Sequence, residues 1–381
     1  TGNRLLAAHQ FQSSSLDVRA ALALHGRRLA VFDVERAIAE GDADGILTSV
    51  ERWRAISHRI NPVTTSTDPE LATLTRELRR LRRLVSDHDG QPPADLVAQV
   101  ARLEDEVAHR EWTLTVGGSA VTTAPPVDSD EARGAAADRG ATIVEFFEHA
   151  GYLWTIVLED GRLDVTRMAS VDTVREQVTR LRRDLRARAM LTPDSPMGAV
   201  LARATASSLA AVDTTLNPSG RASARVVIIP SRSLAAVPWS LLPSLAGRPV
   251  TVSPSLTRWV RGATRGEATA ADPTRLAPVA ALYGPGLART GPEIDAVRAA
   301  WSDGVTGPTG TPTVATSDDV FRALDGARVV HLAAHGTHEA QSPLFSCVQM
   351  ADGPVFAHEF PRPVTAEHVA LSACDVGQFS T

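Results

Sequence analysis

Two residues that could form a catalytic pair follow two apolar runs near the end of the sequence. His335 follows the run Val329–Ala334 and precedes Gly336, and Cys374 follows the run Val369–Ala373. Short apolar runs of this kind are typical of buried strands, and reactive residues of parallel sheets gather just beyond the carboxyl ends of strands. If the two strands are neighbours, they lie about 4.8 Å apart, so that a thiol and an imidazole at their ends can approach each other.

This pair could perform nucleophilic catalysis. A free cysteine thiol has a pKa near 8.5, and an imidazole that takes its proton creates a nucleophile and can later protonate a departing amine. The backbone N–H groups of Gly336 and Cys374 could hold a developing oxyanion, and glycine after the histidine permits close approach of a substrate. The pattern alone equally allows a packed cysteine and a histidine that only bonds a turn. We assign the second cysteine, Cys347, to packing.

A metal site is an alternative for the same region. His331 and His335 share one face of an expected strand, His338 and Glu339 follow closely, and imidazole groups bind zinc. No further group with metal-ligand spacing occurs elsewhere, so we expect neither a metal ion nor another cofactor. The glycine-rich run 284–291 has no lysine for phosphate binding, and its proline lacks a backbone donor, which indicates a turn.

The composition indicates a globular protein. Hydrophobic residues make up 43% and charged residues 22% of the 381 residues, a length that allows two domains. No apolar run approaches the ~18 residues of a membrane span. The net charge is −5 and all 39 basic residues are arginines, so no charge excess attracts nucleic acid or an anionic membrane directly. Two cysteines and no secretory signal lead us to expect no disulfide framework and a cytoplasmic location.

The first 118 residues have helical periodicity and form the first expected domain, a repeat-like helical segment. Gly41 separates two amphipathic stretches, the second of which begins at a good N-cap residue, Asp42. Apolar residues then recur at spacings of three and four over 71–85 and 96–107, which predicts two antiparallel helices that form a hairpin arm. Arginines in the first of these helices could contact nucleic acid, but the glutamates among them favour a solvated helix face.

The rest of the chain differs in composition and hydrophobic pattern. Residues 119–140 are rich in small and polar residues and are interpreted as a linker. The second expected domain, 141–381, begins with short apolar runs typical of an antiparallel meander, and two amphipathic helices then lead to residue 223. From residue 224, apolar strands alternate with helices, which favours a mostly parallel α/β sheet flanked by helices.

Several blocks of this second region resemble one known family. They are Val226–Pro230, Leu234–Pro243, Val330–Gly336, Ser342–Ser346, Ala351–Gly353 and Val369–Gly377. Together they resemble the CHAT domain, a caspase- and separase-like cysteine protease module that is usually attached to tetratricopeptide repeats. The His-Gly and Ser-Ala-Cys blocks, in that order, are the specific part, and the helical segment resembles the family only generically.

The resemblance implies a caspase-like fold over residues 140–381 and roles for individual residues. His335 matches the catalytic histidine and Cys374 the nucleophile, with the backbones of Gly336 and Cys374 as oxyanion donors. Asp375 would shape the substrate-binding pocket for the residue before the scissile bond, or would only anchor its loop. Because the family's chain usually continues past the cysteine, we expect this sequence to be a piece or a processed part of a longer protein.

The resemblance also implies an intracellular endopeptidase, often one of bacterial defence, that cleaves specific partner proteins. The expected partners are a protein substrate and a regulatory protein, with neither nucleic acid nor membrane bound directly, and the helical region would regulate cleavage. The competing hypothesis is a non-catalytic, protease-like interaction scaffold. The presence of both His335 and Cys374 argues against that scaffold.

Overall fold

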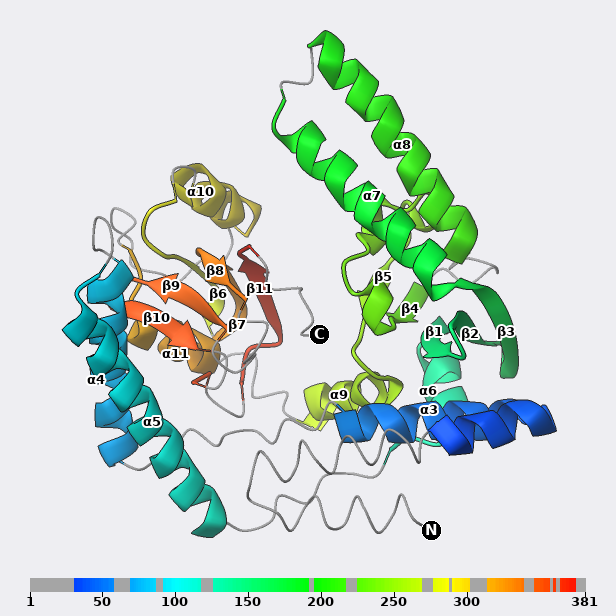
Figure 1. Ribbon diagram of the computed structural model, residues 1–381, viewed down its shortest axis with the longest axis horizontal. Helices are drawn as coiled ribbons and strands as arrows, with labels where there is room; N and C mark the ends of the chain where they lie inside the picture. The colour runs from blue at the N-terminus through cyan, green and yellow to red at the C-terminus, as the bar shows by residue number, and fades with distance from the viewer. Residues whose placement is uncertain are drawn as a thin grey trace. The chain divides into compact units, whose positions relative to one another are not determined.

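Figure 1 shows the computed structural model of the chain. The residues it describes are 31–57, 69–86, 92–117, 126–191, 195–216, 225–268, 277–287, 290–301, 314–338, 346–356, 359–360 and 364–374. Contacts divide the chain into two units, one of Thr1–Arg59 with Thr122–Thr264 and one of Ile60–Val121 with Arg265–Thr381. No helix within the described ranges is both long and apolar enough to cross a lipid bilayer.

The first unit is built on a five-stranded sheet in the order β3-β2-β1-β4-β5. Its strands are β1 (Ala141–His149), β2 (Tyr152–Glu159), β3 (Arg162–Ser170), β4 (Arg225–Ile229) and β5 (Val250–Val252). The first three form the predicted antiparallel meander, and β4 and β5 continue the sheet in parallel. Both hairpins turn through two residues with positive φ, Ala150-Gly151 and Asp160-Gly161, the conformation that tight two-residue turns require.

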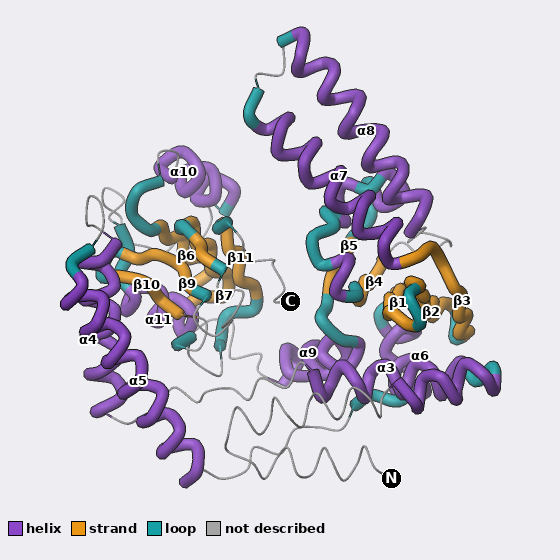
Figure 2. The backbone as a smooth tube through the Cα atoms, in the orientation of Figure 1, coloured by secondary structure: helices purple, strands orange, loops and turns teal. Residues whose placement is uncertain are grey.

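Helices cover both faces of this sheet, as Figure 2 shows. On β4, Val227 and Ile229 belong to a core shared with α3, α6 and α9, whereas Val226 and Ile228 belong to a core shared with α7 and α8. The helices are α3 (Ala43–Ser57), α6 (Ser129–Asp138), α7 (Val171–Ala189), α8 (Pro196–Leu216) and α9 (Leu256–Ala268). The continuous apolar run of β4 therefore reflects burial on both of its faces.

Helix α6 lies inside the stretch 119–140 that the composition marked as a linker. The Asp128 side chain accepts a hydrogen bond from the Glu131 backbone, and the Glu131 side chain accepts one from the Asp128 backbone. This capping box starts a helix whose alanines at 132, 135 and 136 are buried in the unit's core. The linker interpretation is therefore wrong for residues 129–138, because their small residues form a packing face.

Helix α3 begins as predicted, with the Asp42 side chain accepting from the Gly45 backbone at 2.9 Å. It is fastened to the first unit by the buried Glu51. The Glu51 carboxylate accepts hydrogen bonds from the backbone N–H groups of Leu256 (2.9 Å) and Thr257 (2.7 Å), the first residues of α9. Because these amides have no partner within their own helix, a carboxylate from α3 completes α9.

Arg54, one turn further along α3, enters the sheet. Its Nε lies 2.8 Å from Oε1 of Glu145, a residue of β1 with no exposed surface. Its terminal nitrogens donate to the backbone carbonyls of Phe146, Pro230 and Pro254. Burial, followed by the charge of Glu51, raises the pKa of the Glu145 carboxyl well above its ordinary value. Helix α3 is thus part of the α/β unit and not of a separate helical domain, which differs from the expected boundary at residue 118.

The second unit contains two three-stranded sheets, β11-β7-β6 and β10-β9-β8. The first sheet is parallel and consists of β6 (Ala277–Tyr283), β7 (Ala327–Ala333) and β11 (His368–Ser372). The second is antiparallel and consists of β8 (Gly336–Thr337), β9 (Cys347–Met350) and β10 (Gly353–Phe356). Strand β4 pairs in the first unit, so the expected single sheet over 224–381 is divided between two units.

Helices α10 (Thr290–Ala300) and α11 (Ser317–Gly326) accompany the parallel sheet. Helix α11 begins at the predicted cap Thr316, which forms a capping box with Asp319. Its Val320 and Leu324 are buried in one core with Val330 and Leu332 of β7. Alternate residues of β7 therefore face α11, and the residues between them face the opposite side of the sheet.

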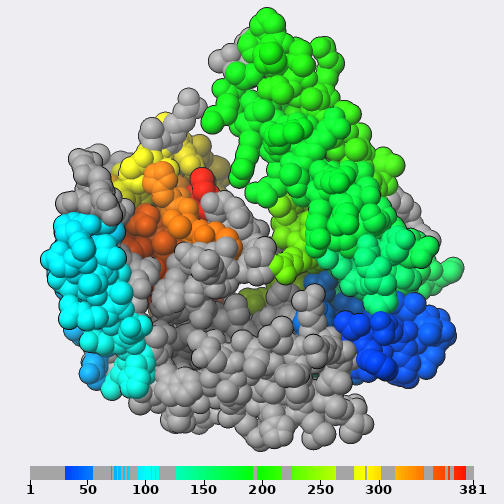
Figure 3. Space-filling model, in the orientation of Figure 1, coloured from blue at the N-terminus to red at the C-terminus, as the bar shows by residue number. Residues whose placement is uncertain are grey.

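The two predicted arm helices are α4 (Pro69–Ser86) and α5 (Ala94–Gly117), which form the cyan surface in Figure 3. Leu78 and Val107 are buried between them, as the apolar spacing predicts. Helix α4 also lies beside β10. These helices therefore belong with the second unit, whereas α3 belongs with the first.

Candidate active site

The two candidate catalytic residues follow two neighbouring parallel strands. Strands β7 and β11 pair in register, with Ala333 opposite Ser372, and the Ala334 N–H donates to the Ser372 carbonyl at 3.1 Å. His335 and Cys374 each come two residues after that last pair, and both are exposed. Because the two strands run parallel and end at this pair, the two residues lie at the same edge of the sheet.

Gly336 lies directly against the backbone of Cys374. A Cβ atom added to Gly336 would lie 2.2 Å from the Cys374 carbonyl oxygen and 3.2 Å from the Ala373 Cβ. No side chain fits at that separation, so the His-Gly sequence allows two chain segments to meet. The close approach expected from this glycine is therefore made to the segment that carries the cysteine.

The loop after β6 forms the third side of this edge. The Gly284 N–H donates to the Ala333 carbonyl at 2.8 Å, which carries the loop to the end of β7. Gly286 has a φ of +77°, and a Cβ atom there would lie 3.5 Å from Nε2 of His335. The imidazole ring thus stands beside Gly286. The sequence indicated a turn here but gave no sign that it borders the histidine.

The β8–β9 ladder fixes the backbone around Gly336. The His335 carbonyl accepts a hydrogen bond from the Gln349 N–H at 2.8 Å, and Gly336 pairs with Val348. In an antiparallel ladder, hydrogen-bonded and non-hydrogen-bonded pairs alternate. Since His335 and Gln349 form a hydrogen-bonded pair, the N–H of Gly336 points away from β9.

Cys347 occupies β9 and differs from the packing role expected of it. Val348 and Met350 of the same strand are buried in the core, whereas Cys347 is only partly buried and points to the other face. The Gln349 amide donates to its sulfur at 3.9 Å. The apolar neighbours in the sequence suggested a core cysteine because they hide which of two alternating faces it occupies.

A polar cluster that the sequence did not predict lies on the face of β7 opposite α11. Nε2 of His331 lies 2.9 Å from Oε1 of Glu293, a residue of α10. A hydrogen bond from the Ser372 side chain, followed by the contact with His331, lowers the pKa of the Glu293 carboxyl. Only the histidine carried a signal in the sequence, as a candidate metal ligand.

The metal alternative finds no support in the described ranges, where no three His, Cys, Asp or Glu side chains gather closely enough to hold an ion. Glu339, a candidate metal ligand, and Asp375, a candidate substrate-binding residue, lie outside those ranges. The roles considered for Asp375, in substrate binding or in anchoring its loop, therefore remain predictions.

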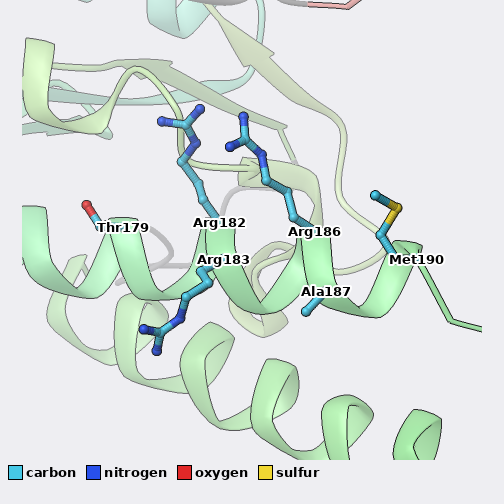
Figure 4. Close-up of a pocket in the computed structure, with 6 residues that line it drawn as sticks. All are labelled: Thr179, Arg182, Arg183, Arg186, Ala187 and Met190. Atoms are coloured by element: carbon cyan, nitrogen blue, oxygen red, sulfur yellow. The ribbon is translucent and has the colours of Figure 1, made fainter.

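A surface depression of a different kind lies on α7 in the first unit (Figure 4). It is lined by Thr179, Arg182, Arg183, Arg186, Ala187 and Met190. The guanidinium groups of Arg182 and Arg186 extend to the same side of the helix. This lining includes no general base that could activate the Thr179 hydroxyl, so the depression is not a candidate for the catalytic reaction.

Comparison with known families gives a match over the second half of the chain. Residues 196–380 match the model of the CHAT domain, a stretch just short of half of the chain. The resemblance inferred from the sequence is confirmed over these residues, which include His335, Gly336 and Cys374. No curated protein matches the chain. The CHAT domain is related to caspase-like cysteine proteases, so the matched residues, which are of mixed α/β structure, are similar to a protease-related module.

Proposed function

On the premise that residues 196–380 match a CHAT domain, we propose that the chain is a cysteine endopeptidase that cleaves specific partner proteins. The observation that carries this proposal is the parallel pairing of β7 with β11, because His335 and Cys374 each follow the carboxyl end of one of these strands. Both side chains are exposed there, as a peptide substrate requires.

In the proposed reaction, His335 takes the proton of the Cys374 thiol and the sulfur attacks the carbonyl carbon of the scissile peptide bond. The carbonyl π electrons move to the oxygen and form a tetrahedral oxyanion. When the oxyanion collapses, the C–N bond breaks, His335 protonates the departing amine, and a thioester remains on Cys374. Water, deprotonated by His335, then attacks the thioester and releases the new carboxyl terminus and the thiol.

The oxyanion would be held by the backbone N–H groups of Gly336 and Cys374. Two observations support this assignment. The β8–β9 ladder leaves the Gly336 N–H pointing away from β9, and the Gly336 backbone lies against the carbonyl of Cys374. Backbone donors fixed in this way need no reorganisation when the negative charge develops, which is the condition under which they accelerate a reaction most.

Regulation by the helical arm or by a protein bound to it is part of the proposal. Helix α4 lies beside β10, β10 pairs with β9, and β9 pairs with β8, which begins at Gly336. A shift of α4 could therefore reach the proposed oxyanion donor through two ladders of hydrogen bonds. Cleavage at the same rate by a chain without residues 69–117 would contradict this route.

The experiment that tests the function co-expresses the protein with the products of neighbouring genes and maps new protein termini by mass spectrometry. Cys374→Ala and His335→Ala should each abolish a cleavage that the unaltered chain performs. Cys347→Ala is the matched control, because it removes the other cysteine of the chain and should leave cleavage intact. Cleavage that survives Cys374→Ala would refute the proposal, and complex formation without cleavage by any variant would favour a scaffold.

A further inference from the structure

We propose that Glu293 is a positioning residue for the candidate active site. Together with His331 and Ser372 it forms what we call the Glu293 clamp, a carboxylate bridge from α10 to the two strands that carry His335 and Cys374. The inference rests on the proposed function for its catalytic meaning, but the contacts of the clamp do not depend on that function.

The clamp joins three elements through one carboxylate. Oε1 of Glu293 lies 2.9 Å from Nε2 of His331 on β7. Hydrogen bonding by the Ser372 side chain on β11 is the largest cause that lowers the pKa of the same carboxyl. The His331 side chain is 16% exposed and that of Glu293 is 36% exposed, so the bridge is partly shielded from water. Hydrogen bonds that include a charged group are shorter and stronger than neutral ones.

The clamp lies near the edge of the sheet at which the candidate catalytic residues follow. Along a strand, every second side chain points to the same face, so His331 shares a face with Ala333 and with Ser372, the register partner of Ala333. The distance along β11 from Ser372 to Cys374 is about 7 Å, and that along β7 from His331 to His335 is about 13 Å. Any change in the separation of the strands at the clamp therefore reaches both residues through a short, paired stretch of backbone.

The order of the three groups excludes a second catalytic triad. In a Ser-His-acid triad the imidazole stands between the hydroxyl and the carboxylate. Here the carboxylate of Glu293 stands between Ser372 and His331, so the imidazole nitrogen that could take a proton from serine is engaged with the acid. The arrangement holds strands together and does not activate Ser372.

A second carboxylate bridges the same two strands at their opposite ends and provides a matched control. Glu367 lies just before β11 and forms two hydrogen bonds with Arg328 of β7, of 3.2 and 3.0 Å. The side chains of Arg328 and Glu367 are each about half exposed. The Glu293 clamp and the Arg328–Glu367 pair thus fasten one strand pair at its two ends, and only the former is next to the candidate site.

The first test measures amide hydrogen exchange at Ala334, whose N–H donates to the Ser372 carbonyl across the β7–β11 ladder. In Glu293→Ala this amide should exchange at least tenfold faster than in the unaltered chain, because the strand ends separate more often, and Glu367→Ala should change it less than twofold. Glu293→Gln keeps a side-chain amide that can bond both Ser372 and His331, so it should restore most of the protection. Unchanged exchange in Glu293→Ala overturns the clamp, whether or not the chain is a protease.

The second test measures how fast iodoacetamide alkylates Cys374, with peptide mapping to separate it from Cys347. His335→Ala should slow this reaction if the two residues act together. Glu293→Ala should slow it about tenfold to a hundredfold, since displacements near 1 Å can cost about a hundredfold in reactivity. Glu293→Gln should be close to the unaltered chain, and a Glu293→Gln rate as low as that of Glu293→Ala would overturn positioning through hydrogen bonds.

A milder variant keeps the test decisive if Glu293→Ala does not fold. Ser372→Ala removes only the β11 side of the clamp and leaves the contact between Glu293 and His331 in place. It should speed exchange at Ala334 about threefold or more and slow alkylation of Cys374, with unchanged thermal unfolding. If His335→Ala does not alter the alkylation rate of Cys374 while Glu293→Ala does alter exchange at Ala334, the catalytic pairing of His335 with Cys374 is refuted and the Glu293 clamp is supported.

Discussion

Replacement of Gly336 by alanine tests the site most directly, because the structure fixes how much room is lacking. The new Cβ atom would lie 2.2 Å from the Cys374 carbonyl oxygen. Ordinary contacts between such atoms need well over 3 Å, so the two backbones must separate by about 1 Å, and overpacking of this kind costs about 1–3 kcal/mol in stability. The segment that moves carries Cys374, and with it one of the two proposed oxyanion donors.

We expect Gly336→Ala to fold and to lose about a hundredfold or more in the rate of substrate cleavage, because misplacement by about 1 Å is enough for a loss of that size. The same variant should slow alkylation of Cys374. The assay is cleavage of the partner identified by co-expression, followed by densitometry, with thermal unfolding measured on the same samples.

Gly326→Ala is the matched control for this substitution. Gly326 ends α11 immediately before β7, and a Cβ atom there would meet nothing within 4 Å. We expect unchanged cleavage and unchanged or slightly higher stability, since alanine is the better helix former. Cleavage by Gly336→Ala at the rate of the Gly326→Ala chain would refute the close packing of Gly336 on Cys374 and the oxyanion assignment built on it.

The other predictions concern the buried charges and caps that hold the elements in place. Arg54→Met should lower the free energy of unfolding by about 3–5 kcal/mol, because it leaves three backbone carbonyls without their donor and the buried Glu145 without its cation. Arg36→Met at the exposed pair with Glu40 should change it by less than about 1 kcal/mol, and chemical denaturation measures both. Glu145→Gln should flatten the pH dependence of the thermal unfolding temperature. Because the pKa of Glu145 is raised in the folded protein, the unaltered chain loses stability as the pH rises from the ordinary glutamate range toward that raised pKa. A pH profile of Glu145→Gln equal to that of the unaltered chain would contradict this. Asp319→Ala should cost about 1 kcal/mol by removing half of the α11 capping box, and because the pKa of Asp319 is lowered, chiefly by the Thr316 backbone, that difference should vanish as the pH falls through the folded pKa.

The local elements of the fold could be predicted from the sequence, but their partners could not. Two glycine turns and three apolar runs specified the meander β1–β3, because a tight two-residue turn pairs the strands on either side of it. The run 225–229 correctly predicted a strand buried on both faces. It could not indicate that β4 pairs with β1 instead of β6, since any apolar strand offers the same backbone groups to its neighbours.

The same limit explains what was missed near the candidate site. Cys374 and His335 could be found because each follows an apolar strand and stands in a block that resembles the CHAT domain. Glu293 gave no signal, since a glutamate in the first turn of a helix is ordinary surface composition. Its contacts with His331 and Ser372 depend on α10 lying over one particular face of the sheet, which helical periodicity does not specify.

The insertion of α3 into the first unit limits how this protein can be cut into pieces. A fragment that begins at residue 196, where the family match starts, would keep β4 but lose β1, its neighbour in the sheet. It would also lose Glu51 and Arg54, so the first amides of α9 and the carbonyls at the ends of the strands would be left without partners. Recombinant work on this chain, and any attempt to transplant its protease-related part onto another protein, must therefore carry residues from before position 60 along with it.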